Sequence, residues 1–200
     1  MQEIIGHHVC ENRDDSEKMI TRGFPKALSI YKKEELRKGN YRPPYLGTGY
    51  YFWDYNIQYS HYWGKNKIRG SYCIYEATIL YNSNMLDLVG NRQDMEIFRD
   101  YYQKFEEAKE INPKLRFDTY SIASCIEYMR ELNLFTYKAI RAIDHTRTLK
   151  EYDYFFNGMT NNKTNLNPLI IVCLVEEDGK DLLTSFELKY EQENEEDYYE

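Results

Sequence analysis

One apolar run near the C-terminus constrains the fold of this chain more than any other feature. Residues 169–175 read "LIIVCLV", an unbroken apolar stretch that begins just after Asn167 and Pro168. Such a run is typical of a strand in the middle of a sheet, covered on both faces. The sequence therefore predicts a sheet-centred protein. A further strand, "LLTSFELKY", is expected to form a hairpin with this run across the turn signal "EDGKD".

Local patterns predict the remaining elements. Three earlier strands are expected at "EIIGHHVC", "YYFWD" and "SYCIYEATILY", and "TYKAIRAI" fits either a strand or a continuing helix. A first helix carries Met19 and Ile20 and ends at Gly23, a helical turn fits "KKEELRK", and a short helix after "YYFWD" is expected to stop at Gly64. Two longer amphipathic helices form an insertion over about residues 93–135. Their apolar positions are Met95, Phe98, Tyr102 and Phe105, then Ile122, Cys125, Ile126 and Met129.

Length and composition narrow the class of protein. The 200 residues fit a single α+β domain, predicted over residues 1–190, and residues 191–200 are predicted to be an acidic, disordered tail. The net charge of -7 disfavours a protein that holds nucleic acid mainly through phosphate contacts. We find no membrane-span or signal pattern, and the four dispersed cysteines fit reduced thiols, so we expect a cytoplasmic protein that does not bind membranes.

The stretch "YLGTGYYFWDYNIQYSHYWG", residues 45–64, is unusually rich in large amphipathic rings. Successive side chains of a strand point to opposite faces, so "YYFW" must present rings on both faces. Some of these rings are therefore expected to face a ligand or partner, and a neutralising protein partner over such a surface is plausible.

These motifs resemble the ADP-ribosyltransferase superfamily, in its diphtheria-toxin and poly(ADP-ribose) polymerase branch. In that branch a first strand carries a histidine, and a second reads glycine, any residue, glycine, an apolar residue, tyrosine and phenylalanine. Here Gly47, Gly49, Tyr51 and Phe52 match the second motif, and Tyr62 follows Tyr51 by the spacing of the family's second tyrosine. The resemblance implies a split mixed or antiparallel sheet around an NAD cleft, with no metal.

The resemblance also implies roles for single residues. Tyr51 and Tyr62 would hold the cationic nicotinamide ring by stacking and cation–π attraction. The spacing back from Gly23 favours His8 over His7 as the residue that would bind the adenosine ribose, and alternation allows only one of the two to line the cleft. The next residue, Val9, would offer its backbone to the nicotinamide carboxamide. Further residues of the NAD site would be Gly49, Tyr59 and Ser60, the last two standing near the position of a family serine.

One part of the family pattern differs in this chain. Transferases of this branch carry a glutamate at the start of the late strand, which stabilises an oxocarbenium-like transition state. Here Asn167 or Pro168 stands at that position. Glu76, Glu127 or Asn167 itself are the candidates for its role, and Asn167 joins His8, Tyr51 and Tyr62 in the predicted catalytic set.

Three functions are consistent with these observations. The first is an NAD-dependent ADP-ribosyltransferase, such as a bacterial toxin or defence-type effector, that releases nicotinamide and transfers ADP-ribose to a protein or nucleic-acid acceptor. The second is an inactive module that binds NAD or ADP-ribose, favoured by the missing glutamate. The third is a ribonuclease with His8 and His145 as its acid and base. A metal site at His7, His8 and Cys10 is disfavoured, because alternation leaves too few ligands on one face.

Overall fold

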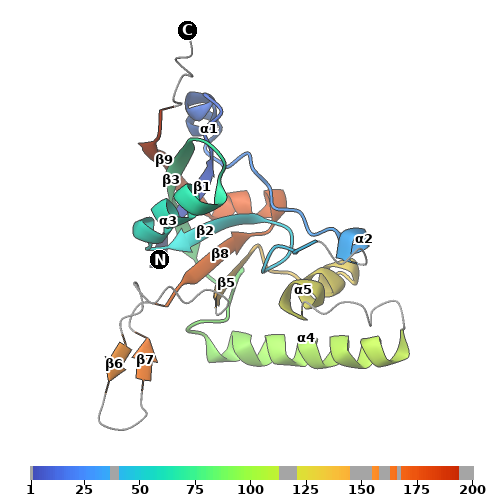
Figure 1. Ribbon diagram of the computed structural model, residues 1–200. Coiled ribbons are helices and arrows are strands. Elements are labelled where there is room, and N and C mark those ends of the chain that lie inside the picture. Colours follow the sequence, from blue (N-terminus) through green and yellow to red (C-terminus); the bar gives the residue numbers. More distant parts are fainter. Residues whose placement is uncertain are drawn as a thin grey trace.

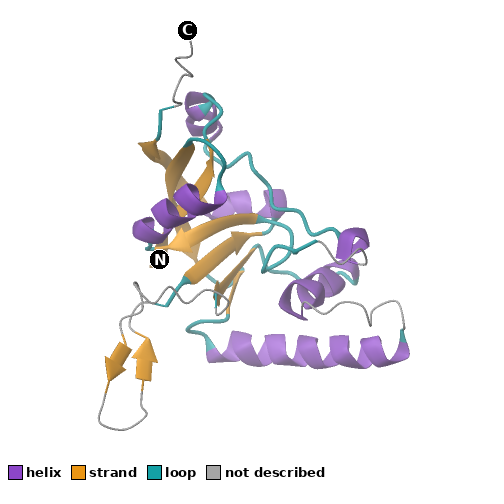
Figure 2. Ribbon diagram, in the orientation of Figure 1, coloured by secondary structure: helices purple, strands orange, loops and turns teal. Residues whose placement is uncertain are grey.

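The computed structural model describes residues 2–36, 41–112, 121–144, 155–157, 163–165 and 168–193. In the described residues the elements run, in chain order, β1 (Gln2–Glu11), α1 (Ser16–Arg22), α2 (Lys33–Leu36), β2 (Tyr50–Asp54), α3 (Ile57–Lys67), β3 (Tyr72–Tyr81), β4 (Met85–Asp87), α4 (Arg92–Ile111), α5 (Ser121–Glu131), β5 (Ala139–Ile143), β6 (Phe155–Asn157), β7 (Lys163–Asn165), β8 (Ile170–Leu174), the 3-10 helix η1 (Glu176–Leu182) and β9 (Leu183–Glu191). Figures 1 and 2 show the arrangement, which is α+β.

A seven-stranded mixed sheet, in the order β4-β5-β8-β2-β1-β3-β9, forms the centre of the molecule. All of its pairings are antiparallel except that of β4 with β5. The apolar run forms β8, between β5 and β2, as its composition predicts. β6 and β7 make a separate two-stranded pair.

The predicted hairpin between the last two strands is wrong. β8 is already paired on both edges, with β2 and β5, so β9 cannot add beside it. Instead η1 carries the chain from one strand to the other, and β9 pairs with β3 at the outer edge of the sheet. A turn signal between two apolar runs fixes where the chain bends, but it does not specify which strand edges are free.

The sheet buries side chains on both faces, so Tyr50, Phe52 and Trp53 lie in two cores and do not face a ligand or partner as the aromatic stretch predicts. On the first face, which we call the α1 face, Tyr50 and Phe52 of β2 pack with Met19 of α1. On the second, the α3 face, Trp53 packs with Tyr59 of α3 and Ile126 of α5. α4 lies beneath α5 in Figure 1 and packs against it.

Most of the predicted elements are confirmed. α1 ends at Gly23, whose φ of 65° is left-handed, and "TYKAIRAI" contributes the strand β5. The insertion consists of α4 and α5, with Phe105, Cys125 and Met129 buried between them. The four cysteines are free thiols, three of them buried. β9 extends to Glu191, the first residue of the predicted tail, and residues 194–200 lie outside the described residues.

No helix within the described ranges combines the length and apolar character needed to cross a membrane.

Gly64 does not end α3, contrary to prediction, because the helix continues to Lys67. Its role is close packing: a Cβ at position 64 would lie 2.3 Å from the Tyr72 ring, which is 1% exposed. The missing side chain lets α3 approach β3.

We predict that Gly64→Ala destabilises the protein by up to about 2 kcal/mol. Alanine favours a helix by roughly 1 kcal/mol, but the forced shift of the Tyr72 ring is an overpacking cost of about 1–3 kcal/mol. Urea unfolding measures the net effect. Lys65→Ala, at the exposed neighbouring position, is the control and is expected to change stability by less than about 0.5 kcal/mol. A stabilised Gly64→Ala variant would contradict the packing role.

Candidate functional site

The candidate site lies where β1 and β2 separate. Their register consists of Gly6↔Asp54 and His7↔Trp53 and ends there. The Tyr55 amide donates to the Ile5 carbonyl at 2.8 Å, so the backbone groups of every second residue of β1, at positions 5, 7 and 9, face β2. A continued ladder would therefore pair Val9 with Tyr51. The two strands instead diverge before this pair forms, and we call this point the β1–β2 fork.

The His8 side chain takes the place of the Val9 amide, which would donate to the Tyr51 carbonyl in a continued ladder. Its Nδ1 lies 2.9 Å from the Tyr51 carbonyl oxygen, which can only accept, so Nδ1 carries the proton. The imidazole is on the α1 face, with its ring centroid 5.5 Å from that of Phe52. His8 is 5% exposed, and burial lowers its pKa to about 4. The ring is therefore neutral, and its Nε2 is a buried acceptor that has no hydrogen-bond partner among the described residues.

His7 points to the opposite face, as strand alternation requires. Its Nε2 lies 3.2 Å from Glu76 Oε2 on β3, and Glu76 Oε1 accepts from Lys189 of β9 at 3.0 Å. Burial lowers the pKa of His7, and the Glu76 carboxylate partly opposes that shift. His7 thus shares the α3 face with Trp53, whereas the predicted ribose ligand, His8, reaches the fork from the α1 face.

Tyr51 connects the fork to the glycine loop that precedes β2. Its ring packs into the cluster of the α3 face, and its hydroxyl donates to the Gly47 carbonyl at 2.7 Å. The same oxygen accepts from the Leu46 amide at 2.9 Å. Burial raises the pKa of this hydroxyl well above its usual value, so it remains a donor. The ring is therefore held at both ends, by its backbone and by its hydroxyl.

Tyr62 also belongs to the α3 face, and it stands at the end of a series of rings. It stacks on Tyr59 at 5.5 Å between centroids, and Tyr59 packs edge-on against Trp53 at 4.4 Å. Tyr59 is 1% exposed, whereas Tyr62 is only partly buried. Val9, Tyr51 and Tyr62 thus border the same apolar cluster.

Other predicted site residues have structural contacts or lie outside the described residues. Gly49 exchanges two backbone hydrogen bonds with Ser29, at 2.9 and 3.1 Å. The fully buried Ser60 hydroxyl donates to the Asn56 carbonyl at 3.0 Å, within its own helix. Asn167 and His145 lie outside the described residues.

Glu76 and Glu127, two candidates for the role of the missing glutamate, are bound by different groups. Glu76 binds His7 and Lys189, as described above. Glu127 of α5 accepts from the Thr48 amide at 2.5 Å and pairs with Arg130 at 3.3 Å. At the described start of β8, Pro168 and Leu169 supply no carboxylate.

A buried ion network beside the site was not predicted from the sequence. Arg141 of β5 binds Asp54, at the end of β2, at 2.7 Å and Asp87 at 3.2 Å. Both carboxylates are under 5% exposed, at 4% and 2%. Residues 54, 87 and 141 are far apart in the chain, so only the sheet order brings them together.

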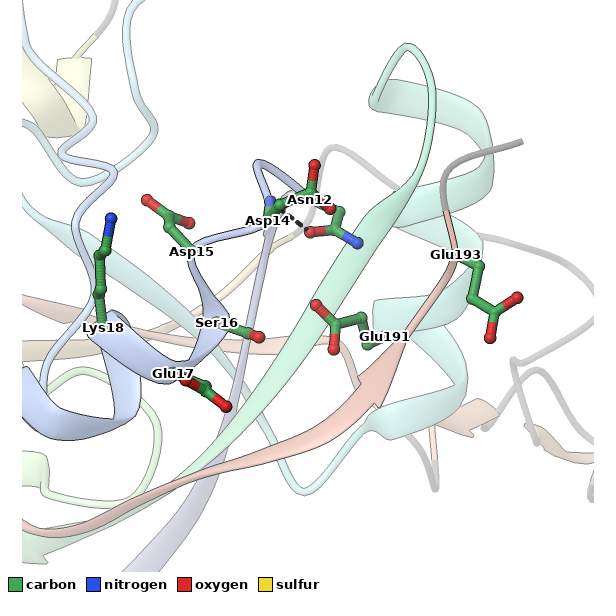
Figure 3. Close-up of a pocket in the computed structure, with 8 residues that line it drawn as sticks. All are labelled: Asn12, Asp14, Asp15, Ser16, Glu17, Lys18, Glu191 and Glu193. Atoms are coloured by element: carbon green, nitrogen blue, oxygen red, sulfur yellow. Dashed lines mark hydrogen bonds between the residues drawn. The ribbon is translucent and has the colours of Figure 1, made fainter. Parts of the chain in front are cut away.

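The described residues also form an acidic groove of about 760 Å³ away from the tyrosines. Figure 3 shows it between the start of α1 and the end of β9, lined by Asn12, Asp14, Asp15, Ser16, Glu17, Lys18, Glu191 and Glu193. Its negative charge does not suit a phosphate group. Among the described residues there is also no cluster of three or more potential metal ligands.

The arrangement can hold a flat, uncharged or cationic ligand between apolar rings at the fork. It offers a buried neutral acceptor at His8 and an open strand edge at Val9.

We predict that His8 makes stability depend on pH between about 6.5 and 4. In this window the unfolded chain binds a proton at His8 that the folded chain does not, so the free energy of unfolding falls as the pH falls, by up to about 3 kcal/mol. His8→Asn keeps an N–H donor but does not titrate, so its stability should fall less. Denaturant unfolding at several pH values compares the two, and parallel curves would contradict the buried neutral histidine.

No protein-family model, no curated protein and no solved structure matches this chain.

Proposed function

We propose that this protein binds NAD at the β1–β2 fork and acts as an ADP-ribosyltransferase. In this reaction the bond between nicotinamide and ribose breaks, nicotinamide leaves with the bonding electrons, and the ADP-ribose is transferred to a protein or nucleic-acid acceptor. A toxin or defence-type effector fits such an activity. The fork is the observation that carries the proposal, because Val9 and Tyr51 border the α3 face there and the His8 imidazole reaches the same point from the α1 face.

The open edge of β1 supports a carboxamide ligand. Beyond the last ladder pair, His7↔Trp53, the backbone groups of Val9 face the space that β2 leaves. A strand edge offers an N–H donor and a C=O acceptor side by side, and a primary amide complements both. The side chain at position 9 affects this interaction only through its bulk.

The rings of the α3 face support a flat cationic ligand. Nicotinamide in NAD is such a ring, and tyrosine faces attract it by about 1–2 kcal/mol for each good contact. Tyr62, which is partly buried and backed by Tyr59, is suited to stack on it. The His8 Nε2, a neutral acceptor, suits a sugar hydroxyl and not a phosphate.

A second function, NAD or ADP-ribose binding without turnover, is favoured by one observation. No carboxylate occurs at the described start of β8, and Glu76 and Glu127 are both held by other groups. The ribonuclease hypothesis gains no such support, because burial keeps His8 neutral and its predicted partner, His145, lies outside the described residues.

Incubation of the purified protein with NAD, followed by chromatography of free nicotinamide and a thermal-shift titration, tests the proposal. We expect nicotinamide release and a raised melting temperature. Tyr62→Ala should weaken the apparent NAD affinity roughly 5- to 30-fold, because it removes one stacking contact worth about 1–2 kcal/mol.

Tyr55→Ala is the matched control, since Tyr55 lies in the same aromatic stretch but is 65% exposed. It should behave like the wild type. A melting shift without nicotinamide release would favour the binding module. If NAD changed neither the melting temperature nor the nicotinamide signal, the proposal would be refuted for the protein without an acceptor, and an added acceptor mixture would be the remaining test.

A further inference from the structure

We infer that Glu127, in the helical insertion, is a positioning residue that holds the glycine loop and, through it, Tyr51 in the geometry of the site. The inference rests on the proposed function for its link to NAD. The structural part of the inference is that one carboxylate of α5 fixes residues 46–49. This part depends only on contacts between described residues.

The first step is the contact between helix and loop. Glu127 Oε1 accepts from the Thr48 amide at 2.5 Å. Hydrogen bonds to an ionised carboxylate are shorter and about twice as strong as neutral ones. The Glu127 side chain is 18% exposed, so water competes poorly for this contact. The carboxylate therefore satisfies a backbone donor that no regular ladder engages.

The loop sequence fits this contact. Gly47 has a φ of 83°, a left-handed conformation that favours glycine. A Cβ at position 47 would lie 2.6 Å from Glu127 Oε1, so a larger residue would also displace the carboxylate. The first glycine of the motif thus makes room for a side chain from α5.

The second step runs from the loop to the ring. The Tyr51 hydroxyl binds the Gly47 carbonyl and the Leu46 amide, the residues just before Thr48. Glu127 and Tyr51 consequently hold the same short loop from two sides. Release of the loop by loss of Glu127 would remove the partners that fix the Tyr51 ring.

Arg130 and Tyr31 also contact this group of residues, which we call the loop anchor: Glu127, Thr48 and the glycine loop. Arg130 pairs with the Glu127 carboxylate at 3.3 Å and lies 3.5 Å from the Thr48 carbonyl. The Tyr31 amide donates to the Thr48 hydroxyl at 3.0 Å. Glu127 is the member that joins the insertion to the loop amide, so a movement of α5 is transmitted to the fork through this residue.

Amide hydrogen exchange of the full-length protein tests the anchor without relying on activity. Glu127→Ala removes the acceptor and is expected to accelerate exchange of residues 46–49 at least about tenfold. Glu127→Gln keeps an acceptor oxygen and should accelerate it much less. Glu131→Ala is the control, because Glu131 lies on the same helix but pairs with the exposed Lys33 and not with the loop amide. It should leave the exchange of the loop unchanged.

The same variants are titrated with NAD in the thermal-shift and nicotinamide assays. We expect Glu127→Ala to weaken the apparent NAD affinity several-fold, with partial rescue in Glu127→Gln and none of this change in Glu131→Ala. Unchanged loop exchange in Glu127→Ala would overturn the inference whatever the NAD result.

Faster exchange combined with a wild-type NAD response would overturn the link from the loop to the site. A wild-type protein that gives no NAD signal would instead refute the proposed function and the NAD link together. The exchange data would still decide, by themselves, whether Glu127 anchors the loop.

Discussion

The hydrogen bond from His8 Nδ1 to the Tyr51 carbonyl is the interaction on which the site depends. In a continuous sheet that carbonyl would accept from the Val9 amide, and the two strands would stay paired. A side chain inserted at this point satisfies the carbonyl while it keeps the strands apart. The hydrogen bond from His8 offsets the loss of the ladder bond to the Tyr51 carbonyl. The edge of β1 can therefore stay unpaired with β2 at this point.

Tyr51 is the residue at which three parts of the structure meet. Its carbonyl binds β1 through His8, and its hydroxyl binds the glycine loop. The loop in turn is bound to α5 by Glu127. The insertion, which is distant in sequence, therefore contacts the fork through a short series of hydrogen bonds. Such a series transmits displacement only if each member is rigid, and the buried hydroxyl of Tyr51 and the short Thr48 contact meet that condition.

The sequence predicts which segments form helices and strands better than it predicts which strands pair. Periodicity identifies β1, β3, α4 and α5 because each buries its apolar side chains in a regular pattern. The hairpin prediction failed because strand pairing depends on which edges are free, and both edges of β8 were already occupied. Gly64 was misread because a glycine that permits close packing looks the same in sequence as one that ends a helix.

For the candidate site, alternation correctly placed His7 and His8 on opposite faces. The roles that the resemblance implies for Tyr51 and Tyr62 stay predictions. The fork itself was not predictable, because it depends on a side chain that replaces a backbone partner across two strands. Glu127 was named only as one of several carboxylates, since nothing local in α5 indicates contact with a loop some 80 residues earlier.

The groups that bind Glu76 and Glu127 indicate which of these two carboxylates is free to move toward a ligand. Cleavage of the nicotinamide bond requires a negative charge near the ribose, and a carboxylate can supply it only by giving up a present partner. Glu76 is bound by Lys189, whose side chain is 36% exposed, and a pair this open to solvent contributes little. Glu127 is bound by a backbone amide and by Arg130, both more enclosed. Release of Glu127 would leave Thr48 unsatisfied, so this carboxylate is better suited to anchor the loop than to move toward a ligand.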